Sequence, residues 1–275
     1  MRMESHLTRR RHCLPWRIAF ISDPHGDLVA FRKVISDVER AGPVDEVLLA
    51  GDLAQGGAQP AEMIDEIRKH GWRSARGNAD DFLVRIADGM PAVEALRVGE
   101  AAHGVAPPSV ATHGEWSVSQ LSSERIEYLR SLPISIVLGP FAFGTVMVVH
   151  ATPWSTEDVV LPNADNELAE RMVREAEARL LVYGHIHTPY QRRVGDAAMI
   201  SVGAVSGSND ADSRPAYTIV NLDTTISVEV RRVDWPMEER LAAYKLAGVE
   251  PRFSRDQPGP FPVRSQPGIA VTVWP

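Results

Sequence analysis

The sequence contains 275 residues, of which 44% are apolar and 24% charged, and its formal net charge is −7. Such values are typical of a globular protein with a substantial core, and the negative charge argues against strong nucleic-acid binding. Cys13 is the single cysteine of the sequence, so a disulfide within the chain is excluded and nothing indicates secretion. We therefore expect a cytoplasmic protein.

The first half of the sequence alternates short apolar runs with amphipathic segments. Residues 1–15 are basic and no apolar stretch follows their arginines, so we interpret them as a basic N-terminal tail and not as a signal peptide. After this tail, strands are predicted over 17–22, 45–51 and 72–77, and helices over 27–43, 60–71 and 79–90. In the first of these helices the apolar side chains recur at helical spacing and share one face.

The second half begins less regularly. Residues 92–119 are rich in glycine, proline and alanine, and their pattern allows no assignment. A long apolar tract over 134–151 is interrupted by glycine and proline, which favours a hairpin of two core strands over a membrane span. The other predicted elements are helices over 122–133, 164–178 and 237–248, and strands over 179–184, 197–205 and 216–233.

This order of elements predicts the fold class and the domains. Strands that alternate with helices and then follow one another directly indicate a layered α/β fold with mixed sheets. We expect one domain over residues 16–235. Residues 236–275 hold seven of the 20 prolines, so we interpret them as a Pro-rich C-terminal extension with a short helix.

Polar residues of the kind that bind metals follow the predicted strands where each one ends. Any one of them has an ordinary explanation as a helix cap, a turn residue or a packed core histidine. Together they predict a single site, because ligands bind at the carboxyl ends of strands in α/β sheets. The residues are Asp23-Pro24-His25, Gly51-Asp52, Gly77-Asn78, His150 and Gly184-His185-Ile186-His187.

The chemistry of these side chains favours two metal ions. Four imidazoles, two carboxylates and one amide, with no thiolate, suit Mn, Fe, Zn, Ni or Co better than a structural zinc site. Seven ligands are too many for one tetrahedral ion, but they suit two ions that share a bridging ligand. Only a carboxylate bridges with two oxygens, so Asp52 or Asp23 takes that role.

In order and spacing, these blocks resemble the signature of the calcineurin-like metallophosphoesterase superfamily over roughly residues 16–233, closest to its small prokaryotic phosphodiesterase branch. The resemblance implies two stacked mixed β-sheets flanked by helices, in four layers (α/β/β/α). It also implies two divalent ions, for which we expect Mn to serve best in vitro. One ion would be held by Asp23, His25, Asp52 and His187, and the other by Asp52, Asn78, His150 and His185.

The sequence departs from this superfamily at two places. Many members carry Gly-Asn-His in the third block, and that histidine binds phosphate and acts as general acid. Here the block is Gly77-Asn78-Ala79-Asp80, so a methyl group stands in its place. The stretch after the last block, often Asn-Pro-Gly-Ser, is Ser201-Val202-Gly203-Ala204. No proposed ligand is lost at either place.

The resemblance implies a phosphoesterase that uses metal-activated water on a small phosphorylated substrate, more in keeping with a phosphodiester or nucleotide-like compound than with a protein. Asp52, Asn78 and His150 would activate the water and position the phosphate through the metals. Asp27 and Asp80 are candidates for orienting the ligand histidines, with a helix N-terminal or a solvated role as the alternative. His113, or His103, is a candidate for reaching the phosphate from the unassigned middle, with an exposed loop histidine as the alternative.

A rival hypothesis is a non-catalytic or weakly catalytic interaction scaffold on the same fold. Scaffolds can lose ligand residues, whereas here every ligand position is filled. A nuclease is disfavoured by the acidic balance, and a phosphoprotein phosphatase by Ala79. We expect no membrane partner, and an oligomer is left open.

Overall fold

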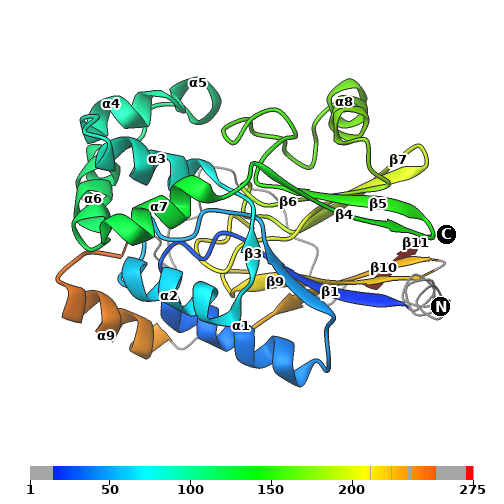
Figure 1. Ribbon diagram of the computed structural model, residues 1–275, viewed down its shortest axis with the longest axis horizontal. Helices are drawn as coiled ribbons and strands as arrows, with labels where there is room; N and C mark the ends of the chain where they lie inside the picture. Colours follow the sequence, from blue (N-terminus) through cyan, green and yellow to red (C-terminus); the bar gives the residue numbers. More distant parts are fainter. Residues whose placement is uncertain (1–14, 211, 224, 235–236, 252–270, 275) are drawn as a thin grey trace, which may run out of the picture.

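Two β-sheets lie face to face in the computed structural model, which describes residues 15–274 except 211, 224, 235–236 and 252–270 (Figure 1). Among the described residues, the first sheet has six strands in the order β11 (Val271–Trp274), β10 (Ile226–Arg232), β9 (Ala216–Leu222), β1 (Trp16–Ile21), β2 (Glu46–Leu49) and β3 (Arg73–Ser74). The second has five, in the order β4 (Ser135–Phe141), β5 (Gly144–Val149), β6 (Leu180–Tyr183), β8 (Ala197–Ser201) and β7 (Tyr190–Val194).

Both sheets are mixed, as predicted. In the first, β1, β2 and β3 are parallel, and β9, β10 and β11 extend it by antiparallel pairing. In the second, β5, β6 and β8 are parallel, while β4 and β7 are antiparallel edges. The carboxyl ends of neighbouring parallel strands meet at the same edge, so the loops that follow them gather there.

Helices cover the outer faces of both sheets, which confirms the predicted four layers (Figure 1). The core between the sheets contains fully buried residues such as Phe20, Val148 and Val182. On the second sheet, α8 (Asn166–Ala176) packs through Met172. The helices that share the core on the first sheet are α1 (Leu28–Arg40), α2 (Pro60–His70), α3 (Asn78–Ala87), α4 (Ala92–Arg97), α6 (Pro108–Ser119) and α7 (Ser123–Ser131).

The segment over 92–119, which the sequence pattern left unassigned, is largely helical. It forms α4, α5 (Glu100–His103) and α6. The first two are too short to show a period, and α6 buries the small residues Ala111, Gly114 and Ser117 instead of an apolar stripe. Gly114 is needed there, because a Cβ atom on it would lie 2.4 Å from Cε1 of Phe82 on α3. Helical packing through small residues leaves little hydrophobic periodicity to detect.

Two strands were also missed. β7 is largely half-buried and polar, so its residues lack the apolar run by which the other strands were recognised. β11 lies inside the segment that we interpreted as an extension, and it pairs with β10. The predicted helix of that extension is present as α9 (Met237–Ala247), whereas nearly all of the basic tail and residues 252–270 lie outside the described residues. The predicted domain boundaries remain predictions.

Membrane insertion was also assessed from helix length and hydropathy. Within the described part of the chain, no helix combines the length and the apolar character needed to cross a bilayer.

Candidate metal centre

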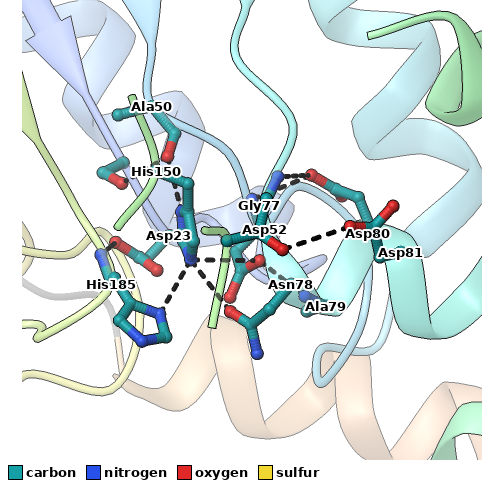
Figure 2. Close-up of polar contacts among 12 residues, drawn as sticks. Asp23, Ala50, Asp52, Gly77, Asn78, Ala79, Asp80, Asp81, His150 and His185 are labelled. Carbon is teal, nitrogen blue, oxygen red and sulfur yellow. Dashed lines mark hydrogen bonds and ion pairs between the residues drawn. The ribbon is translucent and has the colours of Figure 1, made fainter. Parts of the chain in front are cut away.

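The loops that follow five strands bring the seven predicted ligands to one place. Asp23 and His25 follow β1, Asp52 follows β2, and Asn78 begins α3 after β3; His150 follows β5, and His185 and His187 follow β6. Figure 2 shows Asp23, Asp52, Asn78, His150 and His185 turned toward one another. The six ionisable members of the set are all at least 92% buried, since none exceeds 8% exposure.

Three of these side chains form a first group. Nε2 of His187 lies 3.1 Å from Oδ1 of Asp23 and 3.1 Å from Nε2 of His25. Nε2 of His25 lies 3.7 Å from the same Asp23 oxygen. The ligand atoms of the three residues all lie within 4.8 Å of one another, which is compatible with one shared cation.

A second group lies on the other side of Asp52. Nε2 of His150 is 2.9 Å from Oδ1 of Asn78 and 3.0 Å from Nδ1 of His185. Oδ1 of Asp52 lies 3.4 Å from Nε2 of His150, and its Oδ2 lies 3.6 Å from Nε2 of His25. Asp52 therefore faces the first group with one carboxylate oxygen and the second group with the other.

The four histidine rings are all oriented in the same way. One nitrogen of each ring faces a backbone carbonyl, and the other points into the site. A ring that donates its N–H to a carbonyl presents the opposite nitrogen as a lone-pair donor, which is the form a metal requires. The contacts are His25 Nδ1 to Gln55 O (2.7 Å), His150 Nδ1 to Ala50 O (2.6 Å), His187 Nδ1 to Gly207 O (2.6 Å) and His185 Nε2 to Glu157 O (3.2 Å).

These donors fit divalent metal ions. Oδ1 of Asp23 is buried and accepts no well-formed hydrogen bond from the described residues, although it faces two imidazole nitrogens. Nitrogen atoms of neighbouring rings also face each other at 3.0–3.1 Å in both groups. Lone pairs and a buried carboxylate oxygen that converge in this way are satisfied by a shared cation better than by one another.

The electrostatics of the site favour positive charge. Burial opposes protonation of the His150 ring, but the nearby Asp52 carboxylate outweighs it and raises the pKa of His150 to about 10. The pKa of His187 is raised in the same way, because Asp23 outweighs the effect of burial. Burial likewise opposes ionisation of Asp23 and Asp52, yet the histidines hold both pKa values below the ordinary range. Bound cations would compete with protons for this position.

The backbone is strained where it carries these ligands. Among the described residues other than glycine, six have a positive φ. Five of the six are proposed ligands: Asp23 (54°), His25 (47°), Asp52 (59°), His185 (67°) and His187 (53°). A positive φ is uncommon for residues other than glycine and persists where the surroundings enforce it, typically at functional sites.

Glycines allow the loops to approach the ligands closely. A Cβ atom on Gly77 would lie 2.1 Å from Oδ1 of Asp52, and one on Gly184 would lie 1.8 Å from Oγ of Ser22 and 2.9 Å from Oδ2 of Asp23. No side chain fits at either position without displacing the site. The glycines that precede Asn78 and His185 in the sequence therefore have a steric reason.

Asp80 and Asp27 both make contacts at the start of a helix, which was the alternative prediction for them, and their role in orienting the ligand histidines stays a prediction. Asp80 accepts hydrogen bonds from the backbone amides of Asp52 (3.0 Å), Leu53 (2.9 Å) and Gly77 (2.9 Å). Burial, together with the Asp52 charge, raises the pKa of Asp80 to about 7. Asp27 caps α1 by accepting from the amide of Ala30. Each carboxylate thus accepts from a backbone amide at the start of a helix, where amides lack partners within the helix.

The backbone carbonyls that orient the rings could not be predicted from the sequence, because a residue of any type supplies one.

His113 lies on α6, where its Nδ1 is 3.2 Å from Oγ of Ser117 and its ring packs edge-on against Trp116. Its predicted approach to the phosphate stays a prediction. His103 ends α5, and its side chain lies outside the described part of the structure.

Comparisons with known proteins show the family to which the chain belongs. Residues 16–225 match the calcineurin-like phosphoesterase superfamily domain. A metallophosphoesterase from Sphaerobacter thermophilus is 25% identical, with a TM-score of 0.67 over 86% of this chain and 96% of that one. A hypothetical protein from Pyrococcus horikoshii OT3 shares the fold, with 17% identity and a TM-score of 0.71 over 85% and 94% of the two chains. An uncharacterised protein from Methanocaldococcus jannaschii is 23% identical over 239 residues, which are 81% of this chain and 89% of that protein.

Proposed function

Because this chain belongs to the calcineurin-like phosphoesterase superfamily, we propose that it hydrolyses a small phosphodiester or nucleotide-like substrate with the help of two divalent metal ions. At the coarser level the chain is a metal-dependent phosphoesterase with candidate ligand groups for divalent ions. The number of ions, their identity and the ester class are the parts that we propose.

The position of Asp52 is the observation that carries the proposal. Its Oδ1 lies 3.4 Å from Nε2 of His150, and its Oδ2 lies 3.6 Å from Nε2 of His25. We assign one ion to Asp23, His25, Asp52 and His187, and the other to Asp52, Asn78, His150 and His185. Asp52 would then serve both ions, because a carboxylate can offer one oxygen to each. The nitrogen and oxygen donors make Mn²⁺ our first choice in vitro, with Fe, Zn, Ni and Co as alternatives.

When held by these residues, two such ions would supply an acidified water molecule and neutralise charge on the phosphoryl oxygens. The protein contributes the geometry. Backbone carbonyls fix the histidine rings, and Asp80 fixes the backbone of Asp52 and Leu53 through two amide hydrogen bonds. The backbone amide of Ala79 donates to Oδ1 of Asp52 over 2.8 Å, which orients that carboxylate between the two groups. A ligand set positioned in advance loses little free energy to reorganisation during the reaction.

A metal-reconstituted hydrolysis screen tests the proposal. The protein loaded with Mn²⁺ is compared on phosphomonoesters, cyclic nucleotides, dinucleotides and other diesters, with Asp52→Asn as the control for contaminating activity. We expect diesters or dinucleotides to be hydrolysed, and activity to fall by orders of magnitude in the control. Preference for monoesters would overturn the substrate class, and hydrolysis that survives in the control would overturn the site.

The scaffold hypothesis predicts a different result in the same screen. A scaffold would bind metal without turning over any substrate. Every proposed ligand position is filled, and the histidine rings turn their second nitrogens into the site, which supports catalysis over a purely structural role. Absence of hydrolysis across all ester classes in protein shown to carry two ions would favour the scaffold.

A further inference from the structure

The C-terminal helix α9 packs on the protein through polar residues. It lies beside α1 and beyond the residues that match the superfamily domain (Figure 1). Its buried side chains are Arg240 and Tyr244, whereas Leu241 is 47% and Leu246 is 91% exposed. A helix held only by hydrophobic packing would bury its leucines. Burial of a guanidinium group is unfavourable unless the group is paired, so the buried side chain of Arg240 requires a specific partner.

The partner of Arg240 is the loop that carries the first ligands. Nε of Arg240, a residue only 1% exposed, donates to Oδ2 of Asp27 over 2.5 Å. The same carboxylate caps α1 through its other oxygen, and Ser206 Oγ donates to Oδ2 at 3.4 Å. Asp27 comes two residues after His25, so the ion pair fixes the end of the loop that contains Asp23 and His25.

Two further contacts extend this arrangement to neighbouring loops. Ser206 precedes Gly207, whose carbonyl accepts from the His187 ring. The Tyr244 hydroxyl donates to the carbonyl of Gly56 at 3.2 Å, and Gly56 follows Gln55, whose carbonyl accepts from the His25 ring. The contacts of α9 therefore reach the loops that carry or orient Asp23, His25 and His187. The rings of the other group, His150 and His185, are oriented by Ala50 and Glu157.

We propose that Arg240 is a positioning residue for the group of Asp23, His25 and His187, so that α9 sets the affinity of one metal position and leaves the other unchanged. The inference rests on the proposed two-metal function. Outer-shell partners of metal ligands typically change metal affinity by about 10- to 100-fold when they are replaced. We expect a change of that size in Arg240→Met at the position of the first group.

The test measures metal binding by the full chain and does not depend on turnover. Mn²⁺ is titrated by calorimetry, and electron paramagnetic resonance distinguishes a coupled pair of ions from an isolated ion. Arg240→Met should retain one ion with wild-type affinity and bind the other about 10- to 100-fold more weakly. Lys245→Met is the matched control, because it removes an exposed cation from the same helix, and it should bind both ions normally.

Variants of the proposed ligand residues show which of the two metal positions is affected by Arg240→Met. In a His185→Ala background, the remaining ion occupies the first group, and adding Arg240→Met should weaken it by the full factor. In a His187→Ala background, the remaining ion occupies the other group, and the same change should have little effect. Equal effects in the two backgrounds, or the reverse order, would overturn the inference.

A variant that removes the charges of both Asp27 and Arg240 distinguishes a general stabilising role of the ion pair from a role in positioning the metal ligands. Asp27→Asn combined with Arg240→Met leaves no unpaired buried charge, so it should recover most of the thermal stability that Arg240→Met loses. Weak binding at the first position that persists despite this recovery supports positioning, whereas binding that recovers with stability overturns it. Tyr244→Phe, which loses only the hydroxyl, should weaken binding of the same ion to a smaller degree. Wild-type metal affinity at the first position in both the double variant and Tyr244→Phe would also overturn the inference.

The same titration separates this inference from the proposed function. If the wild-type chain binds fewer than two ions, the proposed function fails and the inference fails with it. If the wild type binds two ions and Arg240→Met binds them with unchanged affinities, the inference alone fails.

Discussion

Ala79 holds Asp52 through its backbone, because the amide of Ala79 donates to Oδ1 of Asp52 over 2.8 Å. Its side chain is a methyl group that is 6% exposed, at the position where many superfamily members carry a histidine. The backbone contact to the proposed bridging carboxylate is therefore present, and the imidazole is not. This relationship bears on how the leaving group departs.

The first prediction concerns the leaving group. A general acid typically contributes about 10²- to 10⁴-fold by protonating the leaving oxygen. Because Ala79 offers no proton, aryl esters, whose leaving groups are acidic, should be hydrolysed far faster than alkyl esters. The measurement is the slope of log rate against leaving-group pKa, and Ala79→His should make that slope shallower.

The control for this prediction is His113→Ala. If His113 supplies the proton instead, alkyl diesters would be good substrates of the wild type and the wild-type slope would be shallow. Removal of His113 would then steepen it. That pair of results would place the acid on α6 and contradict the prediction.

The second prediction concerns Gly184. An added Cβ atom would lie 1.8 Å from Oγ of Ser22, so Gly184→Ala should lower the free energy of unfolding by about 1–3 kcal/mol, as overpacking does. It should also weaken metal binding, because the added Cβ atom would lie only 2.9 Å from Oδ2 of Asp23, a proposed ligand. Chemical denaturation and Mn²⁺ titration measure the two effects.

Ser22→Ala in the same chain is the matched rescue, since it removes the hydroxyl that the new methyl group meets. The double variant should regain part of the lost stability. A single Gly184→Ala variant with wild-type stability and metal affinity would show that the loops are not packed as closely as described.

The third prediction concerns the pH dependence of stability at Asp37, away from the metal centre. Burial opposes ionisation of this carboxyl, but hydrogen bonds from Arg231, Arg40 and Tyr217 outweigh it and hold its pKa below the usual value. A lowered folded-state pKa stabilises the protein above the unfolded value near 3.8, and this contribution is lost as the pH falls through the folded value. Asp37→Asn should therefore cost about 2 kcal/mol at pH 7, and less at low pH.

Asp65→Asn is the comparison variant, because Asp65 also pairs with an arginine but is 49% exposed. Solvent screens such a pair, so we expect a loss of about 0–1 kcal/mol. Denaturation curves between about pH 3 and pH 7 test both variants. A difference between wild type and Asp37→Asn that grows as the pH falls would contradict the sign of the prediction.

The sequence was enough to predict which side chains converge on the site, because the carboxyl ends of parallel strands meet at one edge of a sheet. Asp23, Asp52 and His150 each follow a recognisable apolar strand, so their order along the chain was enough to bring them together. The positive φ of His25 and His187 could not be predicted, since local residue type does not reveal strain that tertiary contacts enforce.

Sequence patterns missed other parts of the structure, each for its own physical reason. The carbonyls of Gln55 and Gly207 act through the backbone, which has no residue signature. The packing of α6 on α3 relies on Gly114, a residue that ordinarily indicates a break in a helix. The helix over 237–248 was predicted, but its buried face could not be, because Arg240 is buried and Leu246 is exposed.

The central claim is that Asp52 bridges two divalent ions, and metal content tests it most directly. Elemental analysis of Mn²⁺-loaded protein should give about two ions per chain for the wild type. His187→Ala should mainly empty one position and His185→Ala the other, whereas Asp52→Asn should lower occupancy at both. Normal metal content in Asp52→Asn, or a single ion per wild-type chain, would contradict the account.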